Sequence, residues 1–224
     1  LSVNIAKTIS HYNEERISIL QNIRKEPITN PTLGSWSRDW MNFLKKNIEL
    51  RIDSKEFRIC SYRPFVKSNT YYADNLNQER YQQPKFFPTK QLNNKAIFIT
   101  GIGVNKPFSL IITNEISDYQ IFQNAQCFPL YYYEENKQVQ QDLFDTDDTS
   151  TGSVSGKYVR RDGVSDYILD KATKQYNATN ITKEDIFYYV YGFLHSPEYR
   201  ETFANDLKKM LPRLPLVEDV KDFW

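Results

Sequence analysis

The sequence predicts an α+β domain, with helices at both ends of the chain and a mainly antiparallel β-sheet region between them. Apolar residues recur at helical spacing near the N-terminus and again over residues 182–211. Between these ends lie short segments rich in β-branched and aromatic residues, spaced about ten residues apart. That spacing leaves no room for a helix between successive strands, so it favours antiparallel pairing over β-α-β units.

Two helices are expected in residues 1–50, which we interpret as a helical spacer. Residues 4–25 place apolar side chains at near-helical intervals with charged residues between them, and Pro27 is expected to end this helix. A second, short helix is expected from about Ser35, because its two tryptophans and the apolar residues after them fall on one face.

The strands are expected after residue 55. Their sequences alternate or are continuously apolar, and the expected segments are 57–62, 96–100, 108–113, 118–123 and 126–133. Pro129 lacks an N–H group, so it predicts an edge position or a bulge in the last of these. Residues 134–156 are acidic and then rich in Ser, Thr and Gly, which is typical of a solvated, mobile loop.

The C-terminal helical hairpin carries the clearest local signals. A helix is expected over 165–177, and Thr182 with Asp185 forms a capping-box pattern at the start of the next one. Ser196 and Pro197 then suit the N-cap and first position of a further helix, which Pro212 is expected to stop. These helices are apolar over much of their surface, so we expect them to be scaffold, with Arg213 held by a carboxylate or by helix-end carbonyls.

Charge is divided unevenly along the 224 residues. Residues 1–112 hold 17 Lys and Arg against 9 Asp and Glu, and residues 113–224 hold 12 against 19. A basic half points to a polyanionic partner, although two halves that attract each other would give the same pattern.

Cys60 and Cys127 lie in apolar runs, as buried thiols of a cytoplasmic protein do. No apolar run approaches a membrane span, and the start at Leu1 suggests a piece of a larger protein.

Catalytic and metal-binding patterns are not found. The segment "GIGVNK" (101–106) lacks the spacing of a phosphate-binding loop and lies between two expected strands, where a β-turn needs glycine. His11 is expected to be solvated, and His195 lies at the negative end of an aromatic helix. No Cys/His cluster has zinc spacing, so no catalytic residue and no metal ligand is predicted.

The basic, aromatic centre of the chain is the predicted working surface. From Gly34 to Ile112 there are 13 Lys and Arg against 6 Asp and Glu, interleaved with Tyr and Phe, and residues 77–85 and 90–95 are dense in Asn and Gln. Lys and Arg neutralise phosphates, and Asn, Gln and Arg contact base edges. The predicted DNA-binding residues, which extend to a second basic stretch further along, are Arg58, Arg63, Lys67, Arg80, Lys85, Lys90, Asn105, Lys106, Arg160 and Arg161.

Several motifs together resemble a known family. They are "YRPF" (62–65), "TYY" (70–72), "FPLYYY" (128–133), "EDIFYYVYGFLHSPEYRETF" (184–203) and "PRLPL" (212–216). In this order and spacing they are similar to the C-terminal specificity domain of type ISP single-polypeptide restriction–modification enzymes. The resemblance covers roughly residue 55 onwards. Val66 departs from it, since the family often has an acidic residue after "RPF".

The resemblance implies a target-recognition domain over residues 51–224 that binds duplex DNA and is not itself an enzyme. Upstream methyltransferase and helicase domains of the same polypeptide would then be its partners. They would supply N6-adenine methylation and ATP-dependent cleavage, with S-adenosylmethionine, ATP and Mg²⁺ as their cofactors and none bound here. Two alternatives stay open: a nucleic-acid-processing fragment with its own nuclease activity, and a protein-interaction module.

Overall fold

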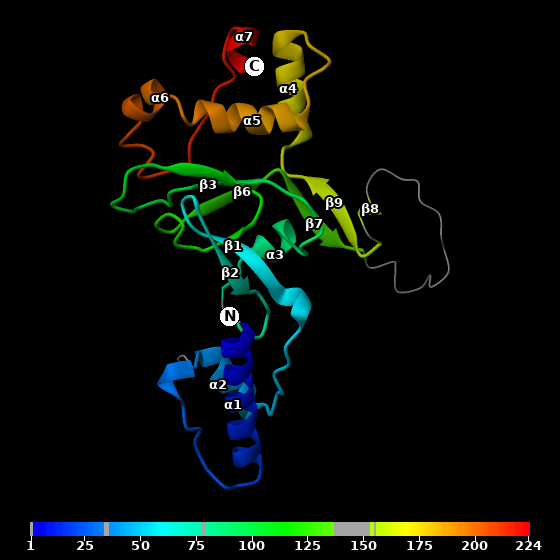
Figure 1. Cartoon of the computed structure of the whole chain (residues 1–224). Coiled ribbons are helices and arrows are strands. Elements are labelled where there is room, and N and C mark those ends of the chain that lie inside the picture. The colour runs from blue at the N-terminus through cyan, green and yellow to red at the C-terminus, as the bar shows by residue number, and fades with distance from the viewer. Residues whose placement is uncertain (1, 34–35, 78, 137–152, 155) are drawn as a thin grey trace. The chain divides into compact units, whose positions relative to one another are not determined.

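The computed structural model describes residues 2–33, 36–77, 79–136, 153–154 and 156–224. Most of the loop predicted over residues 134–156 lies outside these described residues. By packing, the chain divides into a first unit of residues 1–60 and 68–81 and a second unit of residues 61–67 and 82–224. This division does not test the functional boundary expected near residue 50, which stays a prediction. The predicted α+β class is confirmed, with helices at both ends and antiparallel strands between them (Figure 1).

The first unit contains two α-helices, α1 (Ser2–Leu20) and α2 (Arg38–Lys45), and two short 3₁₀ helices, η1 (Pro31–Leu33) and η2 (Ser54–Glu56). Helix α1 is shorter than predicted. Asn22 adopts a left-handed conformation (φ 58°), and the amide of Ile23 donates to the carbonyl of Ser18, which is the pattern of a Schellman cap. The helix therefore ends before the apolar pattern does, and Ile23 is 65% exposed.

The hairpin of β1 (Phe57–Arg63) and β2 (Val66–Tyr71) contributes to both units, since its tip, residues 61–67, packs with the second. In the second unit β5 (Ile116–Ser117) lies next to β1 in the order β2-β1-β5. There the buried hydroxyls of Ser61 and Thr113 share a hydrogen bond of 2.7 Å.

Strand β3 (Ala96–Ile99) is central to the second unit, between β4 (Leu110–Thr113) and β6 (Gln126–Pro129). Both pairings are antiparallel, with Phe98 opposite Ile111 on one side and Cys127 on the other. A third sheet has the order β7-β9-β8, formed by β7 (Tyr131–Glu135), β9 (Tyr158–Asp162) and β8 (Ser153–Val154). The short α3 (Gln83–Phe86) precedes β3.

Four helices complete the second unit: α4 (Asp166–Tyr176), α5 (Lys183–Phe193), α6 (Pro197–Thr202) and α7 (Val220–Phe223). The predicted capping box is present, because Thr182 and Asp185 exchange side-chain and backbone hydrogen bonds at the start of α5. One core joins α5 and α6 to β3. Its buried residues are Ile97, Ile99, Leu130, Phe187, Leu194, Tyr199 and Leu207.

Three local predictions were wrong. Residues 118–123 form turns rather than a strand, because the Asp118 carboxylate accepts from the Gln120 amide (2.6 Å) and stabilises a turn. Residues 126–133 form two strands, since Leu130 leaves the ladder and its amide donates to the carbonyl of Lys95. Helix α6, which was expected to continue to Pro212, ends at Thr202. Residues 203–209 form turns, and Leu207 is buried while Phe203 and Met210 are exposed. The edge position predicted for Pro129 is confirmed, because β6 is an outer strand.

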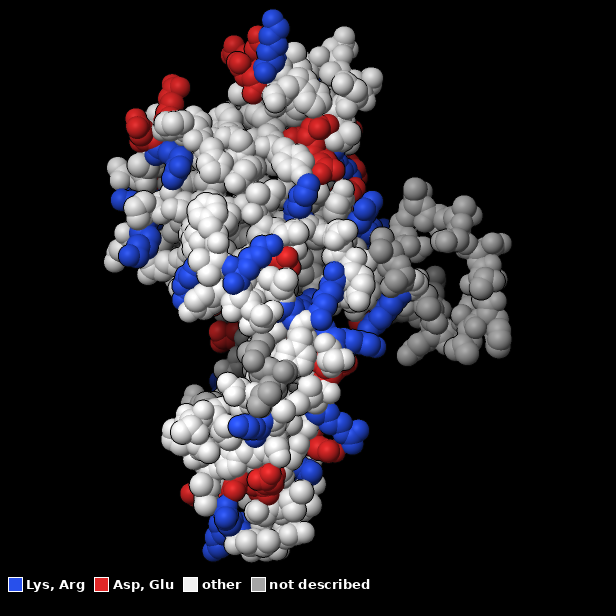
Figure 2. Space-filling model, viewed as in Figure 1, with Lys and Arg blue, Asp and Glu red and all other residues white. Residues whose placement is uncertain are grey.

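Charge is segregated within the second unit. Residues 61–67 and 82–130 carry 6 Lys and Arg against 2 Asp and Glu, whereas residues 163–224 carry 8 against 10. On the face shown in Figure 2, Lys and Arg side chains are frequent over the strands, and Asp and Glu side chains gather towards the helical end. The hairpin tip and the segment from α3 to β6, residues 61–67 and 82–130, are therefore the part of this unit that suits a polyanion.

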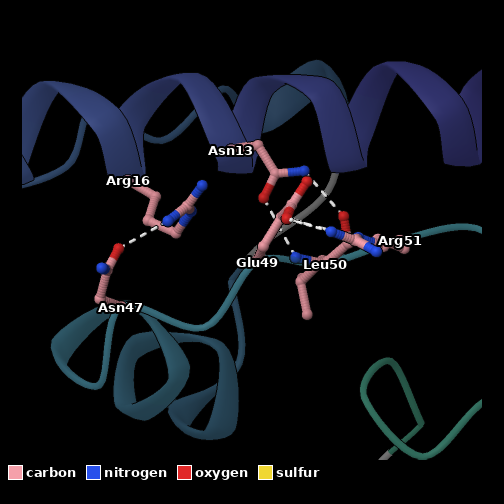
Figure 3. A network of polar contacts seen from close by, with 6 residues as sticks. All are labelled: Asn13, Arg16, Asn47, Glu49, Leu50 and Arg51. Atoms are coloured by element: carbon pink, nitrogen blue, oxygen red, sulfur yellow. Dashed lines mark hydrogen bonds and ion pairs between the residues drawn. The ribbon is translucent and has the colours of Figure 1, made fainter.

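In the first unit, a polar clasp holds α1 to the segment that follows α2 (Figure 3). The Asn13 amide donates to the Leu50 carbonyl (2.8 Å) and accepts from the Leu50 amide (3.1 Å). Leu50 is 1% exposed, so its two backbone groups have no access to water. Nearby, Arg16 donates to the side-chain oxygen of the exposed Asn47 (2.6 Å). The unit's buried core is Ile9, Tyr12, Trp40, Leu44 and Leu50.

Replacing Asn13 by alanine should lower the free energy of unfolding by about 2 kcal/mol, because it leaves two buried backbone groups of Leu50 unpaired. Asn47→Gly is the matched control. It removes the exposed bond to Arg16, and glycine accepts the left-handed backbone at this position (φ 54°). The control should change stability by less than about 0.5 kcal/mol. Urea denaturation measures both, and equal losses would contradict a special role for the clasp.

Candidate nucleic-acid interface

An open groove of about 710 Å³ lies in the second unit, between the β1–β2 hairpin tip and the turns that follow β3 and β5. Its wall includes Pro64, Ile121 and Phe122, and its polar side chains are Arg63, Thr100, Lys106, Ser109, Gln120 and Gln123. Two cationic residues, two glutamines, a threonine and a serine thus line one open space. This combination can meet phosphates and base edges together.

Arg63 is held in place at the groove by weak surface contacts. Its Nη1 donates to the carbonyl of Tyr62 (2.6 Å) and lies 3.4 Å from Oδ2 of Asp118. Its guanidinium lies over the Tyr62 ring, 4.0 Å from the centroid, and its side chain is 42% exposed. An exposed ion pair of this kind contributes little stability, so the guanidinium is oriented and can still exchange its carboxylate for a phosphate.

Lys106 and Asn105 are exposed in the turn that joins β3 to β4. Thr100 and Ser109 close this turn through a backbone hydrogen bond (2.9 Å), and Thr100 Oγ1 accepts from the Ser109 amide (2.9 Å). Gly103 has φ 74°, so the glycine serves a turn between antiparallel strands. The β-turn interpretation of residues 101–106 is confirmed.

Arg160 and Arg161 lie on β9, away from the residues that line the groove. Their neighbours across the strand pair are Tyr133 and Tyr132, so they face opposite sides of the sheet. Arg160 is exposed and lies 4.4 Å from the Tyr131 ring centroid, while Nε of Arg161 is 3.1 Å from Glu134. The two arginines thus lie on opposite faces of this sheet, so a ligand bound to one face would contact only one of them.

The remaining predicted lysines are exposed side chains of the second unit. Lys67 follows the hairpin tip and lies 3.2 Å from Glu115, with its side chain 57% exposed. Lys85 is on α3, and Lys90 lies in the bend after it.

Arg58 and Arg80 differ from the other predicted residues because both are largely buried, in the first unit. Their guanidinium carbons lie 5.4 and 5.0 Å from the ring centroid of Tyr72. Arg58 is 3.9 Å from Glu56, Arg80 pairs with Asp74, and their side chains are only 10% and 18% exposed. Burial raises the pKa of Tyr72 to about 12, with the two arginines opposing the shift. Packing against this tyrosine leaves little of either guanidinium for a phosphate.

Gln120 and Gln123 are groove residues that the sequence analysis missed. Their segment was predicted to be a strand, and a strand would have placed both within a sheet. The available signal was the density of amide side chains in "DYQIFQNAQ" (118–126), which matches that of residues 77–85 and 90–95.

The described residues contain no group of three or more His, Cys, Asp or Glu that could hold a metal ion. Burial raises the pKa of the Cys127 thiol to about 12, which makes it a poor nucleophile at neutral pH.

His11 was predicted to be solvated, but its Nε2 lies 2.8 Å from the carbonyl of Ile28 and its ring contacts Trp36. Arg213 is exposed, and its backbone carbonyl accepts from the Tyr199 hydroxyl (3.2 Å). Among the described helices, none is long and apolar enough to cross a membrane.

A sequence model of the type ISP C-terminal specificity domain matches residues 1–224. The chain belongs to this family. The resemblance seen in the sequence is therefore confirmed, and it extends over the first 50 residues as well. No curated protein gives a significant match to this specificity domain.

Solved structures of similar chains agree. The ATP-dependent type ISP restriction–modification enzyme LlaBIII bound to DNA matches with 26% identity and a TM-score of 0.77, over 99% of this chain and 13% of that one. A DrdV–DNA complex matches with 26% identity and a TM-score of 0.75, over 94% and 19%. A nuclease-deletion mutant of the type ISP enzyme LlaGI, in complex with a DNA substrate mimic, matches with 30% identity and a TM-score of 0.73, over 99% and 18%. The specificity domain thus spans less than a fifth of these chains.

Replacing Arg58 by alanine should lower the free energy of unfolding by about 2 kcal/mol, because it opens a cavity beside Tyr72 and removes a cation–π contact. The exposed Lys85 is the matched control, and Lys85→Ala should stay within about 0.5 kcal/mol of the parent. Thermal unfolding of both variants provides the measurement. A stable Arg58→Ala protein would show that the buried arginine is dispensable for the fold.

Proposed function

We propose that this specificity domain recognises a DNA sequence within a duplex and positions catalytic domains of its polypeptide on that DNA. The observation that carries the proposal is the groove, in which Arg63 and Lys106 can neutralise phosphates while Gln120 and Gln123 can meet base edges. The family supports this role because it is a family of specificity domains. The three similar structures support it because each contains DNA or a DNA mimic.

The rest of the proposal concerns the polypeptide outside this domain. Methyltransferase and helicase domains would be its partners in the same chain, and they would use S-adenosylmethionine, ATP and Mg²⁺. In such a polypeptide this domain would select the DNA sequence, and the methylation and cleavage reactions would take place in other domains. The alternative of an intrinsic nuclease has no specific support in the described residues, which offer no cluster able to hold a metal ion. Reproducible plasmid nicking by this domain in Mg²⁺ would support that alternative instead.

The first experiment is selection from a random duplex library, carried out with the protein at its full native length. The selected consensus then serves in fluorescence-anisotropy titrations over a range of salt concentrations. The slope of log affinity against log salt should fall by about 0.9 for each phosphate contact that is lost. Arg63→Ala and Lys106→Ala should each weaken binding and reduce this slope by about 1.

Gln120→Ala and Gln123→Ala should leave the slope unchanged and relax the preference for particular bases, by about tenfold to a hundredfold per recognised base pair. Lys171→Ala is the control for lost charge, because Lys171 is exposed on α4 in the acidic helical part of the second unit. It should bind like the parent. If the Arg63 and Lys106 variants also bind like the parent, the groove is not the DNA site.

A further inference from the structure

The β1–β2 hairpin ends in a side chain that neither the core nor the groove accounts for. Pro64 and Phe65 form the two-residue turn between the strands, and Phe65 is 94% exposed. It is the most exposed of the large hydrophobic residues that the structure describes. A phenylalanine projecting fully into water from a hairpin tip adds nothing to the packing of the domain.

The backbone at Phe65 makes this choice of residue still less favourable. Its φ is 62°, in the left-handed region, and a proline followed by a positive φ is the pattern of a type II turn. Glycine or asparagine is the usual residue at that turn position, because a side chain with a bulky ring is strained there. The position thus combines local strain with an exposed apolar ring, and such combinations concentrate at functional sites.

The surroundings of Phe65 suit a nucleic acid better than an apolar protein surface. Arg63 and Lys67 lie two residues away on either side, one on each strand of the hairpin. Both are oriented by exposed ion pairs, with Asp118 (3.4 Å) and Glu115 (3.2 Å). The turn that carries Phe65 is therefore flanked in sequence by two cations that can turn to phosphates.

The tip also belongs to the proposed DNA groove. Arg63 and Pro64, which immediately precede Phe65, line that groove together with Lys106, Gln120 and Gln123. A duplex whose backbone is held by Arg63 and Lys106 would bring its bases next to the hairpin tip. Exposed apolar side chains such as Phe insert between base steps in proteins that bend or unstack DNA.

We propose that Phe65 is an intercalating wedge, which inserts between two adjacent base pairs of the duplex bound in the groove and unstacks them. This inference rests on the proposed function, since it needs a bound duplex. Arg63 and Lys67 then hold the phosphates on either side of the opened step. Part of the sequence preference then arises from the base-pair step that Phe65 unstacks, because pyrimidine–purine steps unstack more easily than others.

The test places 2-aminopurine, whose fluorescence rises when it is unstacked, at successive positions of the selected duplex. The protein at its full native length is added, and binding is measured separately by anisotropy. The parent should raise the fluorescence at one step beside the groove, apart from any rise at a base that the methyltransferase flips out of the duplex. Phe65→Ala and Phe65→Gly should abolish the rise and weaken binding roughly 5- to 100-fold, the range found when a base-stacking aromatic is removed. Phe65→Trp should retain the rise.

Two features make the comparison sharp. Phe65→Gly suits the left-handed turn, so it should unfold at the same temperature as the parent or higher, which separates lost insertion from lost folding. Val66→Ala, at an adjacent residue that is 51% exposed, is the matched loss of apolar surface and should leave both fluorescence and affinity unchanged.

The outcomes distinguish the wedge from the proposed function. If the parent binds the duplex but raises the fluorescence at no step beside the groove, or if Phe65→Gly keeps the rise at that step, the wedge is wrong and DNA recognition stands. If the parent does not bind the duplex, both ideas fail. If Phe65→Ala lowers the melting temperature of the full-length protein while leaving DNA binding intact, Phe65 contacts another part of the polypeptide and the wedge is again wrong.

Discussion

The groove of the second unit depends on the burial of one short strand, β3. Ile97 and Ile99 are 1% and 2% exposed and join a core that includes Phe187 of α5. Because β3 is paired on both sides, its register is fixed, and a slip by one residue would turn these isoleucines out of the core. The end of β3 is thereby fixed too, and the groove begins there, with Thr100 bonded to Ser109 and Lys106 between them. The pairing and burial of the apolar strand β3 thus fix the position of the polar residues of the groove.

Features decided by local chemistry could be predicted from the sequence. The capping box of Thr182 and Asp185, the Ser196-Pro197 helix start and the β-turn at 101–106 each involve groups a few residues apart, so their signals are complete within a short window. The order of the motifs from "YRPF" onwards was enough to indicate the family, which the match over the whole chain confirms. The fold class followed because the hydrophobic period changes from helical to strand-like and back.

The candidate site could be predicted only in part, because partners distant in the sequence decide which side chains are exposed. Arg58 and Arg80 occur in the same basic, aromatic stretch as Arg63, yet both pack on Tyr72 while Arg63 faces an open groove. Similarly, Gln120 and Gln123 line the groove because Asp118 makes a turn where alternating residues predicted a strand. In each case the deciding contact is tertiary or a single side-chain bond, which the residue pattern does not reveal.

Phenylalanine has two opposite roles in the second unit. Phe187 is buried in α5 and Phe65 is exposed at the hairpin tip, and the difference lies in what surrounds them. Phe187 packs in a core of aliphatic and aromatic side chains, so its burial stabilises the fold. Two residues from Phe65 on either side in the sequence lie cations in weak ion pairs, which hold their geometry in the free protein and give it up readily to a polyanion. An aromatic ring in a strained turn gains nothing from water, so its place between two such cations in the sequence suits a partner that covers it, and the partner that we propose is DNA.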